Sequence, residues 1–470
     1  MNSSGKTKAT RRMFLAQTVS AAAAVTIVPR HVLGGPRFVP PSDKINVALV
    51  GAGGQGRTNL QILLKEPDVQ VIAVADPIAE HSLEAFYYRG LGGRKPVQGI
   101  IEAHYAPQTP NYRCADYEDF RVMLEKETAL DAILCATPDH LHAYVSIRAM
   151  RAGKHVYCEK PLTHNLWEAR LVAQVAKETG VATQTGNQGH SSEGIRQTCE
   201  WLWDGVIGPV REVHTWVGAS RWNKGLTGRP EGEPPVPLGV NWDLWLGPRE
   251  SRPYHPAYTP VTWRDFWAFG SGSLGDFGCH DLDAACWALD LHGPTSVEAR
   301  PAGNMNAEIG PHGEICYYQF PARGDKPAVK VVWYDGGLQP PCPEEIPPGS
   351  SLPGRGVVFV GDQGRMLCDG AGGPPRLLPY EKTPQYQRPA ATLPRSKGHH
   401  RDWLDACKGG PPASSNFEYG ARLTELALLG VLSLRAGKKI DWDAANLKAS
   451  NVPEADAFIK ETYRPGWELA

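Results

Sequence analysis

INVALVGAGGQG, residues 45–56, contains the pattern from which the first half of the fold follows. Ile45–Val50 is a continuous apolar run, which is typical of a strand buried on both faces of a parallel sheet. The run leads into a loop that fits GxGxxG, and a helix-like segment follows it. Glycines at these places let the backbone approach a pyrophosphate at a helix N-terminus. The loop residues predicted to bind a dinucleotide are Gly51, Gly53, Gly54, Gln55 and Gly56.

A second strand, Val69–Ala75, ends in Asp76, twenty residues after Gly56. An acid at this place accepts hydrogen bonds from the ribose hydroxyls and repels a 2′-phosphate. The sequence therefore predicts NAD as the cofactor and disfavours NADP.

Strands and helices continue to alternate after Asp76, which is typical of a Rossmann domain with a parallel sheet. We place this dinucleotide-binding domain at residues 41–162. From Pro209 strands follow one another without intervening helices, which predicts an α+β domain with a large, mostly antiparallel, open-faced sheet over residues 163–470. The predicted fold class is thus α/β with two domains, and an insertion at about 81–110 receives no role.

The composition is that of a soluble globular protein: the 470 residues are 41% hydrophobic and 21% charged, with a formal net charge of -1. A near-neutral chain lacks the basic surface that attracts nucleic acids or anionic membranes, so no nucleic-acid partner is expected. The ten cysteines contain no CxxC pair and no His/Cys spacing of a metal site. No bound metal is therefore expected.

The N-terminus has the pattern of a targeting segment. Residues 9–15, ATRRMFL, form a twin-arginine motif, and an alanine-rich apolar stretch follows. This stretch is too short and too interrupted by polar residues for a transmembrane anchor. Residues 1–40 are therefore predicted to be a Tat signal and linker, which implies recognition by the Tat export machinery and a periplasmic location.

Two short stretches follow strands at their carboxyl ends, where open α/β sheets bind ligands. They are TPDHLH, residues 137–142, and CEKP, residues 158–161. Their spacing resembles the Gfo/Idh/MocA oxidoreductases, the family of glucose–fructose oxidoreductase and inositol dehydrogenase. The resemblance covers essentially the whole chain after the signal. It implies a sugar or polyol oxidoreductase that forms a homo-oligomer, a dimer or tetramer, through its second sheet. It also implies cofactor contacts from Thr137, Pro138, His142, Glu159 and Lys160.

GDFGCHDLD, residues 275–283, brings a histidine and several acids together. A metal site would need further ligands at compatible spacing, and none is nearby; a capped helix with a core histidine is the structural alternative. Asp276 and His280 are four residues apart and share a helical face. The family resemblance implies that they complete the catalytic site with Lys160. His280 is then the base for a hydroxyl proton, Lys160 stabilises charge on the oxygen, and Asp276 orients His280 or binds neighbouring hydroxyls.

Other candidates carry weaker signals. Asn187 and His190 follow the sixth strand and either line the cleft, with Asn187 near the nicotinamide or the sugar, or form an ordinary strand–helix turn. The Pro/Trp-rich stretch 219–264 is long enough for a lid. Its candidates for substrate contact are Arg221, Trp222, Trp242 and Tyr258. The pair His399–His400 is expected to contact the fold instead of a ligand.

Export limits how the cofactor can be used. The periplasm has no replenished pool of free NAD, so we expect NAD to be loaded in the cytoplasm and to stay bound. The predicted function is oxidation of a secondary hydroxyl of a sugar, polyol or glycoside, with a second substrate that takes the hydride back. One alternative is a redox-neutral glycosidase or lyase that acts by transient oxidation. Another is a non-catalytic sugar or dinucleotide sensor, which would not need both Lys160 and His280.

Overall fold

The structure is a computed structural model that describes residues 39–347 and 349–469. The predicted Tat signal lies outside the described residues, and only positions 39 and 40 of the 1–40 segment are described. The described chain begins with a short 3-10 turn, η1 (Pro41–Asp43). No helix among the described residues is both long enough and apolar enough to cross a bilayer.

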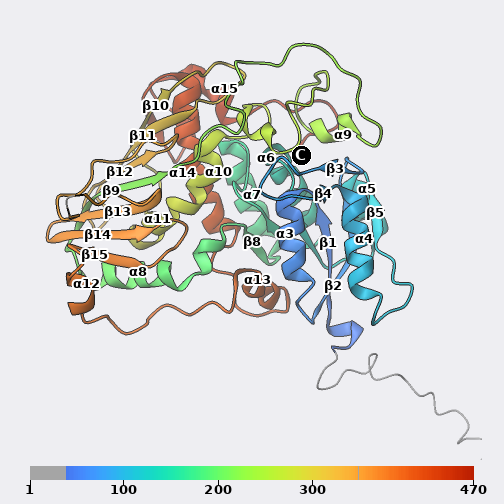
Figure 1. The fold of residues 1–470 in the computed structure, drawn as a ribbon, viewed down its shortest axis with the longest axis horizontal. Helices are drawn as coiled ribbons and strands as arrows, with labels where there is room; N and C mark the ends of the chain where they lie inside the picture. The colour runs from blue at the N-terminus through green and yellow to red at the C-terminus, as the bar shows by residue number, and fades with distance from the viewer. Residues whose placement is uncertain (1–38, 348, 470) are drawn as a thin grey trace, which may run out of the picture. The chain divides into compact units, whose positions relative to one another are not determined.

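Six parallel strands form the first sheet, in the order β5-β2-β1-β6-β7-β8 (Figure 1). They are β1 (Ile45–Val50), β2 (Val69–Ala75), β5 (Ala115–Tyr117), β6 (Ala132–Cys135), β7 (His155–Cys158) and β8 (Thr183–Thr185). The helices between them are α3 (Gly54–Leu63), α4 (Arg94–Tyr105), α5 (Phe120–Lys126), α6 (Asp139–Arg151) and α7 (Leu166–Thr179). Successive strands switch sides between β1 and β6, which is where open α/β sheets bind ligands. The predicted Rossmann domain is confirmed.

The first sheet does not end at residue 162, where the sequence placed the domain boundary. Helix α7 follows that point, and β8 then pairs with β7 in parallel, from Val156↔Thr183 to Cys158↔Thr185. A capping box explains where α7 begins: the Asn165 side chain accepts the Glu168 N–H, and the Glu168 carboxylate accepts the Asn165 N–H. Gly180, at φ 65°, ends the helix in the left-handed region. One more helix and one more strand therefore complete the Rossmann domain.

The insertion after β2 folds into a hairpin and a helix. Two short strands, β3 (His81–Ser82) and β4 (Leu91–Gly92), pair in antiparallel fashion. The helix α4 then leads to β5. The tip of this hairpin, residues 83–90, contains Tyr87 and Tyr88, which reach the site described below.

Nine strands form the second sheet, in the order β15-β14-β13-β9-β12-β11-β10-β16-β17. They are β9 (Val210–Val217), β10 (Ser296–Ala302), β11 (Gly313–Phe320), β12 (Val329–Tyr334), β13 (Arg355–Gly361), β14 (Gly364–Asp369), β15 (Pro375–Leu378), β16 (Ile440–Asp443) and β17 (Lys448–Ala449). Strands β9 and β12 pair in parallel, and every other neighbouring pair is antiparallel. The predicted large, mostly antiparallel sheet is confirmed.

Helices pack on one face of the second sheet and form the largest hydrophobic core of the described chain. They are α8 (Glu193–Trp203), α10 (Gly272–Asp281), α11 (Asp283–Leu289) and α14 (Phe417–Ala436). The other face is only partly open, because the Pro-rich segment 338–355 packs on it. Ile346 and Leu352 of this segment are buried in a cluster with Trp216 and Val358 of the sheet. The chain itself therefore covers part of this face of the sheet.

Helix α14 connects the two halves. Its first residue, Phe417, donates its N–H to Thr183 Oγ1 (3.0 Å), and a Cβ on Gly420 would lie 1.9 Å from Thr185 Oγ1. The same helix packs against α7, α10 and β10. Figure 1 shows α10 and α14 between the two sheets. The remaining elements are η2 (Gln188–Ser191), α9 (Trp242–Leu246), η3 (Thr262–Asp265), α12 (Lys382–Gln385), α13 (His399–Cys407), η4 (Pro453–Ala455) and α15 (Asp456–Ile459).

Candidate active site

A cavity of about 380 Å³ lies where the carboxyl ends of the first-sheet strands face helix α10. Its wall comes from the glycine loop, the hairpin after β2, and segments of the second domain. The sequence-predicted residues that line it are Gly51, Gly53, Gly54, Gln55, Asp76, Thr137, Pro138, His142, Glu159, Lys160, Asp276 and His280. Residues from both domains thus meet at one cavity.

The glycine loop leaves room for a ligand at the start of α3. Gly51 has φ +93°, and a Cβ there would lie 2.5 Å from the Ala136 carbonyl carbon. Apart from its two chain neighbours, no described residue has an atom within 4 Å of the position that a Cβ on Gly53 would take, and no side chain caps the helix that begins at Gly54. The uncapped N–H groups of the first helical turn are therefore available to an anion such as a pyrophosphate. The loop fits a bound dinucleotide.

Asp76 lies at the end of β2 and faces the same cavity. Its Oδ2 accepts the Ala52 N–H (2.7 Å), and its Oδ1 accepts the Ile78 N–H (2.8 Å). Burial raises the pKa of this carboxyl, and the nearby His81 and the two N–H groups oppose that shift. The backbone thus holds the carboxylate in one orientation. The remaining lone pairs of the carboxylate can accept hydrogen bonds from the ribose hydroxyls.

The predicted catalytic lysine is paired with the predicted catalytic acid. Lys160 Nζ donates to Asp276 Oδ1 (2.6 Å) and to the Asp276 carbonyl oxygen (2.7 Å). Arg264 Nε lies 3.4 Å from Asp276 Oδ2. Burial alone would lower the pKa of Lys160, but the Asp276 carboxylate outweighs it and the pKa is raised. The ammonium group is therefore charged at neutral pH and remains close to the cavity.

His280 lies one turn after Asp276 on α10 and faces the cavity. Its Nδ1 is buried without a hydrogen-bond partner among the described residues. Burial lowers the pKa of His280 well below its ordinary value, and the positive charges of Lys160 and Arg355 add to the effect. The imidazole is thus neutral at physiological pH and can accept a proton.

Asp139 is a second titratable group beside the lysine, and the sequence reasoning missed it. It is the first residue of α6, lines the cavity, and accepts a hydrogen bond from Ser271 Oγ (3.2 Å). Burial raises the pKa of Asp139 to about 7, with Arg264 opposing and Asp276 reinforcing the shift. A carboxyl with this pKa can both donate and accept a proton near neutral pH.

Polar contacts of His142 and Glu159 hold the EKP loop, residues 159–161, in place. His142 Nδ1 lies 2.7 Å from the Pro161 carbonyl oxygen, and Nε2 lies 2.8 Å from that of Thr137. Glu159 Oε1 accepts hydrogen bonds from Asn59 Nδ2 (2.9 Å) and from the side chains of Gln188 and Gln55. His142 therefore joins the two sequence motifs to each other, while Glu159 connects the lysine loop to α3.

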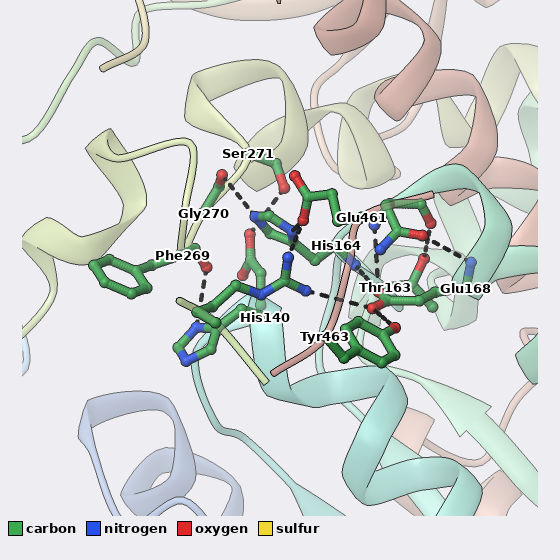
Figure 2. A network of polar contacts seen from close by, with 12 residues as sticks. His140, Thr163, His164, Glu168, Phe269, Gly270, Ser271, Glu461 and Tyr463 are labelled. Carbon is green, nitrogen blue, oxygen red and sulfur yellow. Dashed lines mark hydrogen bonds and ion pairs between the residues drawn. The ribbon is translucent and has the colours of Figure 1, made fainter. Parts of the chain in front are cut away.

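A buried polar network behind the cavity wall holds the segment after Lys160 in place (Figure 2). The Glu168 carboxylate accepts the His164 N–H (2.9 Å) and the Tyr463 hydroxyl. His164 Nδ1 lies 3.1 Å from Glu461 Oε2, and its Nε2 lies 3.2 Å from the Gly270 carbonyl oxygen. The network thus ties the lysine loop, the segment before α10 and the C-terminal tail together.

Two predicted cofactor residues lie outside the cavity lining. Gly56 packs against the strand, and a Cβ there would lie 2.1 Å from the Gly51 carbonyl oxygen. Asn187 is fully buried: its Nδ2 donates to Asp283 Oδ2 (3.0 Å), and its Oδ1 accepts the Ser415 hydroxyl (2.5 Å). Asp283 Oδ1 also lies 3.0 Å from His190 Nδ1. Asn187 is therefore an internal structural residue, which corrects its assignment to the cofactor.

The stretch 219–264 contributes different residues from most of those predicted. Trp222 lines the cavity, but Trp242 and Tyr258 belong to a hydrophobic cluster, and Arg221 donates to backbone carbonyls such as that of Leu226 (2.7 Å). The lining residues that sequence reasoning did not select include Asp139, Tyr87, Tyr88, Arg264 and Arg355. No local motif marks them, apart from the position of Asp139 directly after the TP dipeptide. The pair His399–His400 contacts Thr185, Gln184 and Asn59, as expected of a structural pair.

One buried group among the described residues has the spacing of metal ligands. The ligand atoms of Cys135, His142 and Cys158 lie within 4.8 Å of one another. Cys135 and Cys158 are brought side by side by the pairing of β6 with β7, which no local spacing could indicate. Both ring nitrogens of His142 already face carbonyl oxygens, as described above. The arrangement therefore does not fit a metal ion.

A glycine loop at a helix N-terminus, an acid at the end of β2 and a lysine–histidine pair in one cavity define a dinucleotide-dependent oxidoreductase. Comparison with family models agrees. The model described as "Oxidoreductase family, NAD-binding Rossmann fold" matches residues 45–187, and "Oxidoreductase family, C-terminal alpha/beta domain" matches residues 203–320. Together they span more than half of the chain. The protein belongs to the Gfo/Idh/MocA oxidoreductase family, and its cofactor is NAD.

Several characterised proteins are similar to parts of this chain. Levoglucosan dehydrogenase of Pseudarthrobacter phenanthrenivorans is 24% identical over 52% of this chain and 50% of its own length. The 2,7-anhydro-N-acetylneuraminate hydratase of Mediterraneibacter gnavus is 25% identical over 36% of this chain and 39% of its own length. The chain thus matches half or less of the length of these relatives.

Two solved structures share the fold. The WlbA dehydrogenase of Bordetella pertussis, in complex with NADH and UDP-GlcNAcA, has a TM-score of 0.56 at 17% identity, and the match covers 85% of this chain and 99% of the other. The aldose-aldose oxidoreductase of Caulobacter crescentus, complexed with glycerol, has a TM-score of 0.54 at 18% identity, with 85% and 100% covered. The order of a Rossmann domain and a large sheet domain is therefore common to all three.

Proposed function

We propose that the protein is an exported oxidoreductase that oxidises a secondary hydroxyl of a sugar, polyol or glycoside. The observation that carries the proposal is the meeting of Lys160, Asp276 and neutral His280 in the cavity that the glycine loop also lines. The names of relatives, including a levoglucosan dehydrogenase, support a sugar substrate. A periplasmic location is part of the proposal and rests on the twin-arginine motif in residues 9–15.

Each residue has a role that follows from its charge. Bound NAD supplies the hydride acceptor. His280, neutral and without a partner at Nδ1, takes the proton of the substrate hydroxyl as the carbonyl forms. Lys160 remains charged and stabilises the negative charge that develops on the same oxygen. Asp276 holds the lysine in position and keeps its pKa raised.

Retention of the cofactor is supported by the hairpin after β2. The Tyr88 ring rests on the glycine loop so closely that a Cβ on Gly54 would lie 2.2 Å from it. The Tyr87 ring is tilted against Tyr88, with ring centroids 4.0 Å apart, and stacks on the ring of Trp222 in the second domain at 6.0 Å. These rings connect the glycine loop to the second domain beside the proposed cofactor site.

A redox-neutral glycosidase or lyase is the second candidate, and Asp139 favours it. Simple oxidation needs one base, which His280 provides, whereas elimination next to a transient carbonyl needs a second group to remove a C–H proton. Asp139, with its pKa raised to about 7, is such a group in the same cavity. Turnover in deuterated water separates the two: the elimination route requires deuterium at the carbon beside the oxidised position.

The first experiment is to purify the protein without residues 1–40, denature it, and identify released small molecules by mass spectrometry. Stoichiometric NAD supports a retained cofactor, and sugars and glycosides are then screened for turnover without added NAD. Release of NADP would contradict the assignment of Asp76. A Lys160→Met variant that binds sugars as tightly as the wild type, with neither protein turning them over, would favour the sensor instead.

A homo-oligomer formed through the outer face of the second sheet is also proposed. Partly exposed apolar side chains, Ile315, Tyr317 and Val360, lie around the buried cluster on that face. Light scattering would give the mass in solution, and a charged substitution such as Tyr317→Glu should lower it. A monomeric wild type would contradict the proposal.

A further inference from the structure

Arg355 lies in the active-site cavity although nothing in its local sequence marks it. It is the first residue of β13 and stands at the end of the Pro-rich segment that covers part of the outer face of the sheet. Its guanidinium carbon lies 5.5 Å from the ring centroid of Phe277, and Lys160 Nζ lies 6.0 Å from the same centroid. Lys160 and Arg355 therefore both lie near one aromatic ring of the cavity wall.

The guanidinium of Arg355 is anchored on one side only. Its Nε lies 2.8 Å from Asp281 Oδ1 and 3.0 Å from Oδ2. Its Nη2 is buried without a partner, and no hydrogen bond to another described residue occupies Nη1. Of the five N–H donors of a guanidinium, the two on Nη1 therefore remain for a ligand that enters from the cavity. The side chain is 32% exposed, which leaves it accessible from the cavity.

Neighbouring residues fix the position of the Arg355 side chain. Asp281 is fully buried at its side chain and also accepts the Ala371 N–H (3.0 Å), so the carboxylate cannot turn away. A Cβ on Gly370 would lie 2.3 Å from Arg355 Cγ and 2.6 Å from Asp281 Oδ1. Glycine at this position thus leaves the room in which the pair lies. The guanidinium is held in one orientation before any ligand binds.

Ion pairs order the charged groups at this end of the cavity. Lys160 and Arg264 share the Asp276 carboxylate, and Arg355 uses Asp281 with its Nε alone. Two further carboxyls line the cavity: Asp139, whose pKa burial raises to about 7, and Glu159, which accepts hydrogen bonds from Asn59 and Gln188. An anionic substituent that reaches Arg355 would gain charge-assisted hydrogen bonds from Nη1, and such bonds are roughly twice as strong as neutral ones.

We propose that Arg355 binds a carboxylate of the substrate, which makes the substrate class an acidic sugar such as a uronate or its glycoside. The inference rests on the proposed function for the position of the sugar between Lys160 and Arg355. It goes beyond that function because it selects acidic sugars among all sugars and polyols. Arg355 is accordingly a specificity-determining residue and takes no part in the proton transfer.

Binding is measured by isothermal titration of the NAD-loaded protein with D-glucuronate, D-galacturonate and the corresponding amides, which lack the charge. The wild type should bind at least one acid about 10- to 100-fold more tightly than its amide, as expected of hydrogen bonds to a charged group. Arg355→Gln should remove that preference and leave the affinity for the amide unchanged. Arg355→Lys should keep part of the preference, because it keeps the charge but not the fork.

Two further proteins serve as controls. The double variant R355Q/D281N removes the buried charge that R355Q alone would leave unpaired, and an asparagine still accepts the Ala371 N–H. Arg211→Gln removes an exposed arginine that pairs with Asp362 and does not line the cavity, and it should behave as the wild type. Fluorescence titration with NADH confirms that each variant keeps its cofactor site.

Equal binding of acid and amide by the wild type, or a preference that survives in both R355Q and the double variant, overturns the inference. Failure of every uronate to bind overturns it as well. Tighter binding of sugar phosphates than of uronates would contradict the choice of a carboxylate. A preference that depends on Arg355 without any turnover would instead contradict the proposed function and leave the binding site established.

Discussion

Replacement of Asp276 by asparagine tests how the site keeps its lysine charged. Burial alone would raise the pKa of the Asp276 carboxyl, but Lys160 and Arg264 hold it below its ordinary value. The ion pair therefore stabilises the fold above the ordinary pKa of an aspartate and is lost as the pH falls through the lowered one. Above that range Asp276→Asn removes a negative charge from between two cations.

The magnitude follows from burial. The side chains of Lys160 and Asp276 are 14% and 11% exposed, so the pair is screened little by water. Removal of one member of a buried pair costs about 3–5 kcal/mol. The asparagine oxygen still accepts one hydrogen bond from Lys160, so we expect a loss of about 3 kcal/mol, at the lower end of that range. Asp362→Asn, in an exposed pair with Arg211, should cost much less, because water and salt screen such a pair.

The pH dependence of turnover gives the sharper readout. In the wild type the raised pKa of Lys160 keeps the ammonium charged across the neutral and moderately alkaline range. Without Asp276, burial and Arg264 both lower this pKa, so the variant should lose activity as the pH rises, at a pH where the wild type is still active. Reduction of the bound cofactor after mixing with substrate is followed by NADH absorbance, and stability by urea unfolding at pH 7. An unchanged alkaline limb together with a stability loss no larger than that of D362N would refute the reasoning.

Three further predictions concern the proton acceptor and the cofactor. His280→Asn should lower kcat by about 10²–10⁴-fold, with little change in the dissociation constant of NADH. The acid limb of the wild-type pH profile of kcat should lie well below pH 6.5, since the pKa of His280 is lowered. An acid limb that persists unchanged in the variant would exclude His280 as the base. Asp76→Ser should shift the preference toward NADP on the order of tenfold by removing the charge that repels a 2′-phosphate. The measurement is the ratio of the dissociation constants of NADH and NADPH for the cofactor-free protein, and an unaltered ratio would contradict the role of Asp76. Tyr88→Ala should speed the release of NADH about tenfold by removing the ring that rests on Gly54, as measured by stopped-flow fluorescence. Tyr254→Ala, outside the cavity lining, is the control. Equal release rates in the wild type and Tyr88→Ala would show that the hairpin does not retain the cofactor.

The first sheet and the glycine loop could be predicted because their signals are local. The apolar run Ile45–Val50, the loop after it and the acid at the end of the next strand lie within about thirty residues, at spacings that the backbone geometry requires. Asp276 and His280 were predictable for a similar reason, since residues four apart on a helix share a face. Their role with Lys160 came only from the likeness to a family, because sequence spacing alone does not join residues 116 positions apart.

Long-range packing decided the rest. Asn187 carries the same local signal as a cleft residue, and only the approach of Asp283 and Ser415 from other segments shows that its amide is used inside the fold. Asp139, Tyr88 and Arg355 come from a helix start, a hairpin tip and a strand start, and each meets the cavity through tertiary contacts that no periodicity encodes. Hydrophobic periodicity reports which face of an element is buried but not what that face packs against. The sequence by itself therefore determined the nucleotide-binding half and the helix that carries Asp276 and His280. The tertiary structure decided which further side chains line the cavity with them.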